Sequence, residues 1–245
     1  MKNILFFAHR GGGHGIYENR LATIKKTLQN PRVDAVEVDI RLTKDGVLVV
    51  HHDRGVYING KRFWIDKLKY NEIKHFDIPT FVEVLRLFKG SGKAINIDIK
   101  DERCANSLAV IIKRNNFKVP MYIDCFNLET LLELQEYIPE AVYCLSHNPK
   151  DSFDFNRRFV FRILTLLITI FFTQFVVYFL KKKFRRVTID GISVHAKFAT
   201  VGFVNDLKAF GFKIFVYGVD SKQEFYRTSK LNIDGIKTEQ PSVFY

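Results

Sequence analysis

The sequence predicts an α/β protein whose strands close into a (β/α)₈ barrel, and three observations favour this fold. Short apolar runs rich in β-branched and aromatic residues recur along the chain, most of them separated by stretches with helical spacing. These runs are apolar almost without interruption, which is typical of a parallel sheet covered on both faces. The length of 245 residues suits about eight strand–helix units in one domain.

The predicted strands run from one end of the chain to the other. They are 4–8, 35–42, 47–50, 94–99, 121–126, 141–145, 191–194, 213–219 and 235–238. Helices are predicted between them, for example where Leu21, Ile24 and Leu28 fall at i, i+3 and i+7. The residues KDG at 44–46 predict a tight turn between two strands, with Gly46 at positive φ. No linker or repeat divides the chain, so we expect one barrel domain over 1–245.

The net charge of +12 and the pI near 9.5 point to an anionic partner, either nucleic acid, a phosphate-bearing substrate or an acidic membrane surface. No nucleic-acid-binding motif is present and the aromatic residues are mostly Phe, so we expect no nucleic acid. The three cysteines are odd in number and have no metal-type spacing, which disfavours a disulfide framework or a zinc site built on them and fits a reducing compartment. The apolar run at the N-terminus is too short for a signal peptide, so we expect no export.

Polar side chains gather where predicted strands end. They are His9, Arg10, Glu37, Asp39, His52, Asp98 and Lys100. In a parallel barrel the carboxyl ends of the strands meet at one rim, and chemistry is found there. The sequence therefore predicts one site on that rim.

Glu37 and Asp39 are one residue apart, so on a strand both carboxylates point to the same face. Together with Asp98 they would form an all-oxygen site of the kind that suits Mg²⁺ or Ca²⁺. Two alternatives stay open. The acids could pair with lysines and arginines as salt bridges on the rim, or they could share a zinc ion with histidines, although no HExxH-like spacing is present.

His9 and His52 titrate near neutral pH and can give and take protons. A lone histidine at a strand end is often structural. Two of them beside a carboxylate cluster, with Arg10 and Lys100 to hold an anion, indicate a site that cleaves phosphodiesters.

At this point the sequence resembles the glycerophosphodiester phosphodiesterases, which have a TIM-barrel fold. The matching stretches are AHRGGGHGIYENRLATI (8–24), AVEVDIRLTKDGVLVVHHD (35–53), DIPTFVEVL (77–85), INIDIK (95–100), FKIFVYGVDSKQEF (212–225) and DGIKTEQP (234–241). The resemblance implies metal-dependent hydrolysis of glycerophosphodiesters to glycerol 3-phosphate and an alcohol. In that family the glycerol 2-hydroxyl is thought to attack phosphorus first, and water then opens the cyclic phosphate.

The resemblance also implies a role for each matching residue. His9 and His52 would be the acid/base pair, and Glu37, Asp39 and Asp98 would bind the metal, Mg²⁺ or Ca²⁺. Arg10, Glu18, Lys100 and Tyr217 would contact or line the substrate. Three departures from the family pattern bear on the substrate: YENR replaces PENT, Asp98 replaces a glutamate, and Tyr217 begins a Tyr-Gly-Val-Asp run where the family has Trp-Thr-Val-Asn.

The segment 159–180 is almost wholly apolar and is flanked by basic residues, so 157–183 is predicted to associate with a membrane. As a helix its 22 residues would span about 33 Å, near the thickness of a bilayer core. A single crossing would divide a closed barrel, so we expect monotopic insertion or re-entrance. A buried helix or an oligomer contact are the alternatives.

The expected protein is thus a glycerophosphodiesterase on the cytoplasmic side of a membrane, peripheral or monotopic. It would act on glycerophosphodiesters or on lysophospholipids, the latter giving a lysophosphatidate-like product. Two alternatives remain: a phospholipase that stops at the cyclic phosphate, and a non-catalytic lipid-binding protein on the same fold.

Overall fold

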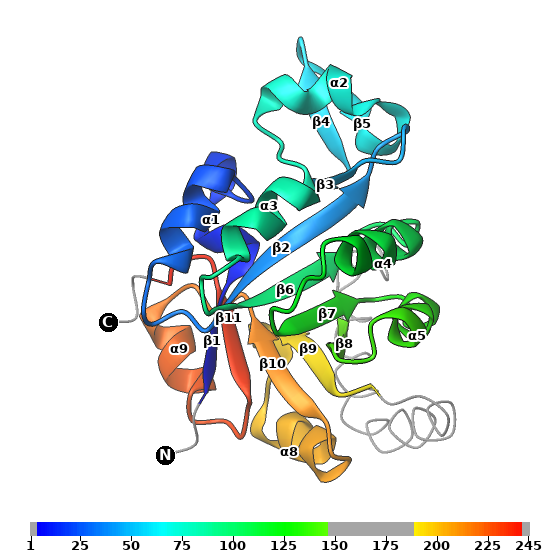
Figure 1. The fold of residues 1–245 in the computed structure, drawn as a ribbon. Helices are drawn as coiled ribbons and strands as arrows, with labels where there is room; N and C mark the ends of the chain where they lie inside the picture. Colours follow the sequence, from blue (N-terminus) through cyan, green and yellow to red (C-terminus); the bar gives the residue numbers. More distant parts are fainter. Residues whose placement is uncertain (1–3, 147–188, 242–245) are drawn as a thin grey trace, which may run out of the picture.

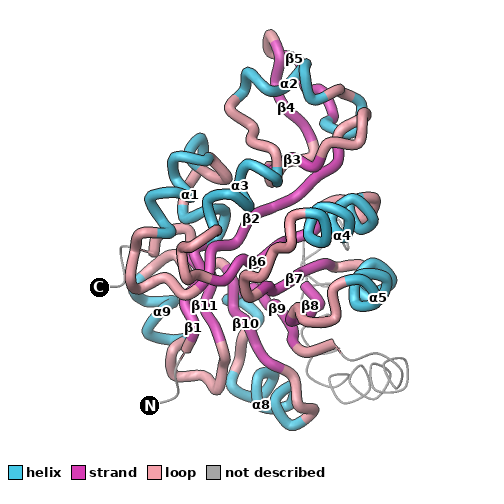
Figure 2. The backbone as a smooth tube through the Cα atoms, viewed as in Figure 1, coloured by secondary structure: helices cyan, strands magenta, loops and turns pink. Residues whose placement is uncertain are grey.

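A computed structural model describes residues 4–146 and 189–241 as a ring of parallel strands with helices outside it (Figures 1 and 2). The barrel strands are β1 (Leu5–Ala8), β2 (Ala35–Leu42), β6 (Ala94–Ile99), β7 (Met121–Cys125), β8 (Val142–Ser146), β9 (Gly191–His195), β10 (Lys213–Tyr217) and β11 (Gly235–Thr238). Each is parallel to its neighbours in the order β1-β11-β10-β9-β8-β7-β6-β2, and β1 pairs with β2 to close the ring. The predicted barrel is therefore confirmed.

Helices cover the outside of the ring. They are α1 (Leu21–Leu28), α3 (Phe81–Phe88), α4 (Cys104–Arg114), α5 (Leu128–Tyr137), α8 (Val201–Ala209) and α9 (Lys222–Thr228). Helix α3 shows why they form. The Thr80 hydroxyl accepts from the Glu83 amide and the Glu83 carboxylate accepts from Thr80, which caps the first turn, while Phe81 and Phe88 are fully buried.

The amino end of the barrel interior is filled by aromatic side chains. Phe7, Tyr122 and Phe215 pack edge to face, with ring centroids 5.0 to 5.6 Å apart. Two residues farther along each of these chain segments, on the same inner face, the side chain is polar: His9, Asp124 and Tyr217. The amino end of the interior is therefore apolar, and its carboxyl end is polar.

One predicted strand, 47–50, lies outside the barrel. It forms β3 (Leu48–Val50), which pairs antiparallel with β2. The turn predicted at 44–46 is the cause, because a tight turn reverses the chain and can only join antiparallel strands. The Thr43 amide donates to the Val47 carbonyl across it, and Gly46 has a φ of 79°.

After β3 the chain builds a small unit that the sequence reading missed. Its elements are β4 (Gly55–Ile58), β5 (Lys61–Trp64), η3 (Ile65–Lys67), α2 (Tyr70–Ile73) and η4 (Lys74–Phe76). The two strands form a hairpin that pairs with no barrel strand, and Val56, Ile65 and Ile73 give the unit its own apolar cluster. In Figure 1 the unit stands beyond the carboxyl end of β2.

The apolar segment 157–183 lies outside the described residues. Strands β8 and β9 pair directly on either side of it, Cys144 opposite Gly191. In the parts of the chain that the structure describes, no helix combines the length and the hydropathy that a membrane span requires.

Three further short helices complete the described chain. They are η1 (His9–Gly12), η2 (Gly15–Tyr17) and η6 (Ala196–Phe198), and each follows the carboxyl end of a barrel strand.

Candidate active site

The loop after β1 has an unusual backbone that positions His9 and Arg10. Arg10, Gly11 and Gly12 all have positive φ, at 50°, 76° and 81°. A Cβ on Gly12 would lie 2.5 Å from the Thr27 hydroxyl, so glycine is required there. The turn aims the Arg10 amide at Glu37, whose Oε2 accepts from it at 2.5 Å. The loop is therefore tied to the carboxylates of β2.

Glu37, Asp39 and Asp98 come together on β2 and β6. Asp39 and Asp98 are register partners one residue before the last pair of these strands, and Glu37 lies two residues earlier on the same face of β2. Each offers an oxygen within 4.8 Å of the others, and all three are at least largely buried. Glu37 Oε1, Asp39 Oδ1 and Asp98 Oδ1 are buried without a hydrogen-bond partner. Buried oxygens converging in this way fit a hard divalent cation, and the shorter Asp98 side chain still reaches the cluster.

Lys100 supplies part of the compensating charge. Its Nζ lies 2.7 Å from Asp98 Oδ2 and 3.2 Å from Asp39 Oδ1. Burial opposes the ionised form of Asp39, but Lys100 and the two site histidines outweigh it, so the pKa of Asp39 is lowered. Burial and the nearby Asp39 raise the pKa of Glu37 to about 7. The single positive charge of Lys100 is too small to neutralise the negative charge of three ionised carboxylates.

His52, which follows β3, lies between a carboxylate and a cation. Its Nδ1 is 3.0 Å from Asp53 Oδ1 and its Nε2 is 3.0 Å from Arg10 Nη2. Because arginine can only donate, these partners place the proton on Nδ1 and leave Nε2 as an acceptor. Arg10 also binds Glu18, with 2.9 Å between Nη1 and Oε2.

Glu239, just beyond β11, is a site residue that the sequence reading missed. Its carboxylate lies 3.5 Å from His9 Nδ1, 3.6 Å from Arg10 Nε and 2.5 Å from His14 Nδ1. Hydrogen bonding to His9 lowers the pKa of Glu239 to about 2. Burial opposes the charge on His9, but Glu37 and Glu239 together raise its pKa. The available signal was the position of Glu239 at the end of the last strand.

Tyr217 closes the opposite side of the site. Its ring centroid lies 6.4 Å from that of His9 and 5.1 Å from that of His195. His195, at the end of β9, accepts from the Lys197 amide through Nδ1. All nine predicted site residues thus lie on one rim.

Arg41, a second residue missed from the sequence, ties two loops of the rim together. Its Nε and Nη2 donate to the His52 carbonyl at 2.9 and 2.8 Å, and its Nη1 donates to the Lys100 carbonyl at 3.2 Å. It also lines a cavity of about 390 Å³ beside the site, with Lys100, Phe126 and, from the hairpin unit, Arg54 and Ile65.

A buried ion pair lies beside the carboxylates, because Asp124 on β7 is the register partner of Asp98. Lys237 Nζ is 2.5 Å from Asp124 Oδ2, and Asp124 also accepts from Ser193 and Asn96. Lys237 is 5 % and Asp124 1 % exposed, so each depends on the other for its charge to be compensated.

The combination of buried carboxylates, two histidines and two cations on the rim of a (β/α)₈ barrel fits a phosphoric diester hydrolase. The sequence profile of the Glycerophosphoryl diester phosphodiesterase family matches residues 9–243. The chain belongs to that family, and its function is that of a glycerophosphodiester phosphodiesterase.

Individual proteins of known name or structure are similar to this chain over nearly its whole length. A glycerophosphodiester phosphodiesterase of Caldanaerobacter subterraneus is 27 % identical, over 97 % of this chain and 94 % of that protein. Human lysophospholipase D GDPD1 is 24 % identical, over 96 % of this chain and 83 % of its own. The crystal structure of the Thermotoga maritima glycerophosphodiester phosphodiesterase matches with a TM-score of 0.71, at 24 % identity over 98 % of this chain and 96 % of that one. An Oleispira antarctica phosphodiesterase, solved with sn-glycerol-3-phosphate, matches with a TM-score of 0.75, at 19 % identity over 97 % and 93 %.

Proposed function

We propose that the chain hydrolyses glycerophosphodiesters with a divalent cation, Mg²⁺ or Ca²⁺, held by Glu37, Asp39 and Asp98. The observation that carries this proposal is the cluster of three buried carboxylates, each of which has one oxygen without a hydrogen bond and offers an oxygen within 4.8 Å of the other two. A bound cation would stabilise negative charge on the phosphoryl oxygens.

In this proposal His9 and His52 form the acid/base pair. One takes the proton of the glycerol 2-hydroxyl as it attacks phosphorus, and the other gives a proton to the departing alcohol oxygen. Water then opens the cyclic phosphate with the two roles exchanged. Glu239 and Asp53 lie on the Nδ1 sides of the two rings, so proton transfer would use the Nε2 atoms; in His52 this atom faces Arg10 and would exchange that contact for one with the substrate.

The other site residues contact the substrate. Arg10 and Lys100 carry their positive charges beside the carboxylates and hold the phosphate. Glu18 orients Arg10, and Tyr217 offers a ring face to the glycerol moiety.

The metal proposal predicts how stability depends on pH after divalent ions are removed. The pKa of Glu37 in the folded chain, about 7, exceeds its ordinary 4.5, so the unfolded chain ionises first as pH rises. Glu37 therefore favours the folded state below its ordinary pKa, and this contribution is lost as pH rises through about 7. The size of the effect is on the order of a few kcal/mol. Glu37→Gln should reduce this loss, as measured by urea unfolding in EDTA across that pH range, while His9 and Asp98, whose pKa values are also raised, supply the remainder.

The same variant tests whether the cation binds at Glu37. Mg²⁺ or Ca²⁺ should raise the Tm of the unaltered protein above pH 7 and restore its turnover after EDTA, and should do neither for Glu37→Gln. Glu133→Gln, on the exposed surface of α5, is the matched control. Equal Tm increases in both variants would contradict a metal site at Glu37.

We also propose that lysophospholipids are substrates. Four exposed apolar side chains lie on loops that follow barrel strands at the catalytic rim: Ile16, Tyr17, Phe126 and Phe198. Such side chains suit contact with an acyl chain. The cavity beside Lys100 is the proposed place for the part of the diester beyond the phosphate. The name lysophospholipase D of two relatives supports this substrate class.

A substrate comparison tests this proposal. We expect kcat/KM for a lysophosphatidylcholine to exceed that for glycerophosphocholine, and the replacement of Tyr17 and Phe198 by Ser to lower only the former. An unchanged ratio in that variant would remove the acyl-chain argument while leaving the hydrolase assignment intact.

We also propose that the segment 157–183, which lies outside the described residues, associates with a membrane on its cytoplasmic side. Its composition, apolar with basic flanks, supports it.

A further inference from the structure

One face of the β4–β5 hairpin carries aromatic and cationic side chains and is open to solvent. The register pairs Tyr57 with Arg62 and Gly55 with Trp64, and alternation along each strand puts Tyr57, Arg62 and Trp64 on the same face. Tyr57 is 66 % exposed and Trp64 is 38 % exposed. The opposite face holds Val56, which is buried in the apolar cluster of the unit.

The aromatic face is strongly basic. The guanidinium carbons of Arg62 and Arg54 lie 4.6 and 5.2 Å from the centre of the Trp64 ring. Residues 54–69 contain five cations, Arg54, Lys61, Arg62, Lys67 and Lys69, and a single acid, Asp66. Asp66 lies 4.0 Å from Arg54 Nη2 and 3.5 Å from Lys67 Nζ, so it offsets part of this charge, and the stretch keeps four positive charges in excess.

These side chains have no evident role in the stability of the unit. Its described core lies on the other face, and all four residues of β5 are exposed. Tryptophan and tyrosine favour the boundary between water and lipid, and clustered arginines and lysines favour anionic head groups. A surface that combines them matches an acidic bilayer in both charge and polarity.

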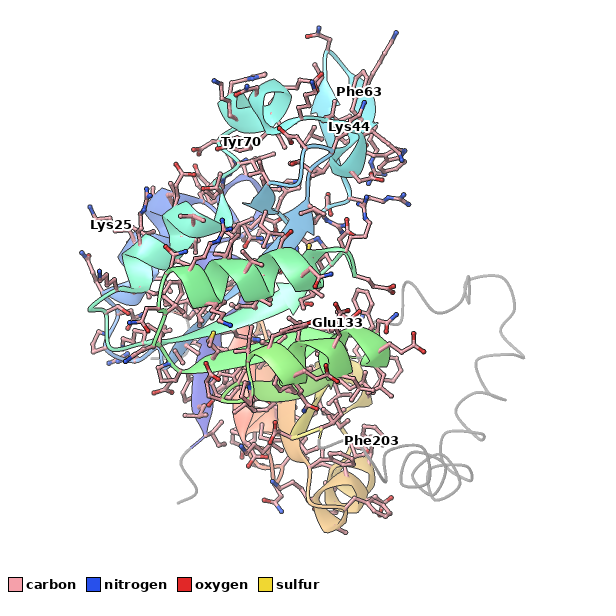
Figure 3. The ribbon with its side chains drawn as sticks, turned by 45° about the vertical axis from the view of Figure 1, so that its right-hand side comes forward. Lys25, Lys44, Phe63, Tyr70, Glu133 and Phe203 are labelled. Carbon is pink, nitrogen blue, oxygen red and sulfur yellow. The ribbon has the colours of Figure 1, made fainter. Side chains whose placement is uncertain are left out.

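The hairpin is also well placed relative to the site. Arg54 follows His52 by two residues, and Arg54 and Ile65 line the cavity beside Lys100. Figure 3 labels Phe63 on this unit, at the end of the molecule beyond the barrel. A bilayer against the hairpin would therefore lie near the catalytic rim.

We propose that the outer face of the β4–β5 hairpin, formed by Tyr57, Arg62, Trp64 and Arg54, docks on the surface of a bilayer that contains anionic lipids. This goes beyond the hydrolase reaction and does not depend on it. It is also separate from any insertion of 157–183.

Trp64 is the only tryptophan in the chain, so its fluorescence reports on this face alone. With the full chain, we expect vesicles of phosphatidylcholine plus phosphatidylserine to shift its emission to the blue and brominated lipids to quench it. Pure phosphatidylcholine should do so weakly, and added salt should reverse the effect.

The test variant is Tyr57→Ser combined with Arg62→Glu. We expect it to lose at least about tenfold in affinity for the acidic vesicles, because one cation becomes an anion and an interfacial aromatic is removed. The matched control is Tyr226→Ser with Lys230→Glu, since Lys230 Nζ lies 3.6 Å from the centre of the Tyr226 ring and Tyr226 is 65 % exposed. The control should bind vesicles as the unaltered protein does.

Three results would overturn the proposal. The two double variants could bind acidic vesicles equally well. Vesicles could bind the protein without quenching of Trp64, which would assign binding to another segment such as 157–183. The blue shift could appear with rising protein concentration and no lipid, which would assign the face to a second copy of the chain. Hydrolysis of a water-soluble glycerophosphodiester should be unchanged in both variants, and its absence from the unaltered protein would count against the proposed function alone.

Discussion

His52→Ala should reduce kcat for a soluble glycerophosphodiester by about a hundredfold to ten-thousandfold, the range for loss of a positioned proton donor or acceptor. The physical reason is the arrangement around the ring. Asp53 fixes the proton on Nδ1, and Nε2 is the atom left facing Arg10 and the proposed phosphate position. The measurement is steady-state turnover with Mg²⁺ or Ca²⁺ present.

The fold should survive this substitution, since the His52 side chain is partly exposed and lies on a loop. Thermal unfolding checks this point, and His75→Ala, at an exposed position away from the rim, is the matched control. Full turnover by His52→Ala would reject the acid/base role. Absence of turnover in the unaltered protein, together with normal lipid binding, would instead favour a non-catalytic lipid-binding protein.

Lys237→Met should cost about 3–5 kcal/mol in the free energy of unfolding. Methionine fills much of the same space, but it leaves the Asp124 carboxylate buried without its cation. The remaining partners of Asp124 donate hydrogen bonds and supply no charge; they are Ser146, Ser193 and Asn96. Urea unfolding, with the m-value compared between variants, measures the loss.

A second substitution identifies the cause. Adding Asp124→Asn to Lys237→Met removes the uncompensated charge and should recover part of the lost stability, so the two changes should be non-additive. If the loss in the free energy of unfolding of the double variant equals the sum of the losses of the two single variants, the buried charge is not the source of the loss.

Much of the fold was predictable because parallel barrel strands are buried on both faces and therefore leave continuous apolar runs. The predicted runs at 35–42, 94–99 and 235–238 agree with β2, β6 and β11 to the residue. The site followed from the same logic. Asp39 and Asp98 could be placed on one rim because each lies toward the carboxyl end of a strand, and alternation along β2 put Glu37 on the same face as Asp39. The resemblance then supplied the proposed roles.

The remainder could not be predicted because it depends on contacts between distant parts of the chain. Nothing local to Glu239 shows that it meets His9 and His14 from the other end of the sequence. The pairing of Lys237 with Asp124 spans 113 positions. The short strand β5 is exposed throughout, so it lacks the buried apolar pattern that identified the other strands.

The hydrogen bonds that Arg41 makes to two loops of the rim affect how the protein can evolve. The planar guanidinium of Arg41 donates to the carbonyls of both His52 and Lys100. It therefore fixes the backbone of His52, the last proposed catalytic residue before the hairpin unit. Mutations or insertions in the hairpin can then alter the surface that the protein binds without displacing the His52 imidazole. Recognition of a surface and cleavage of a bond can therefore evolve separately, although only one residue lies between His52 and Arg54.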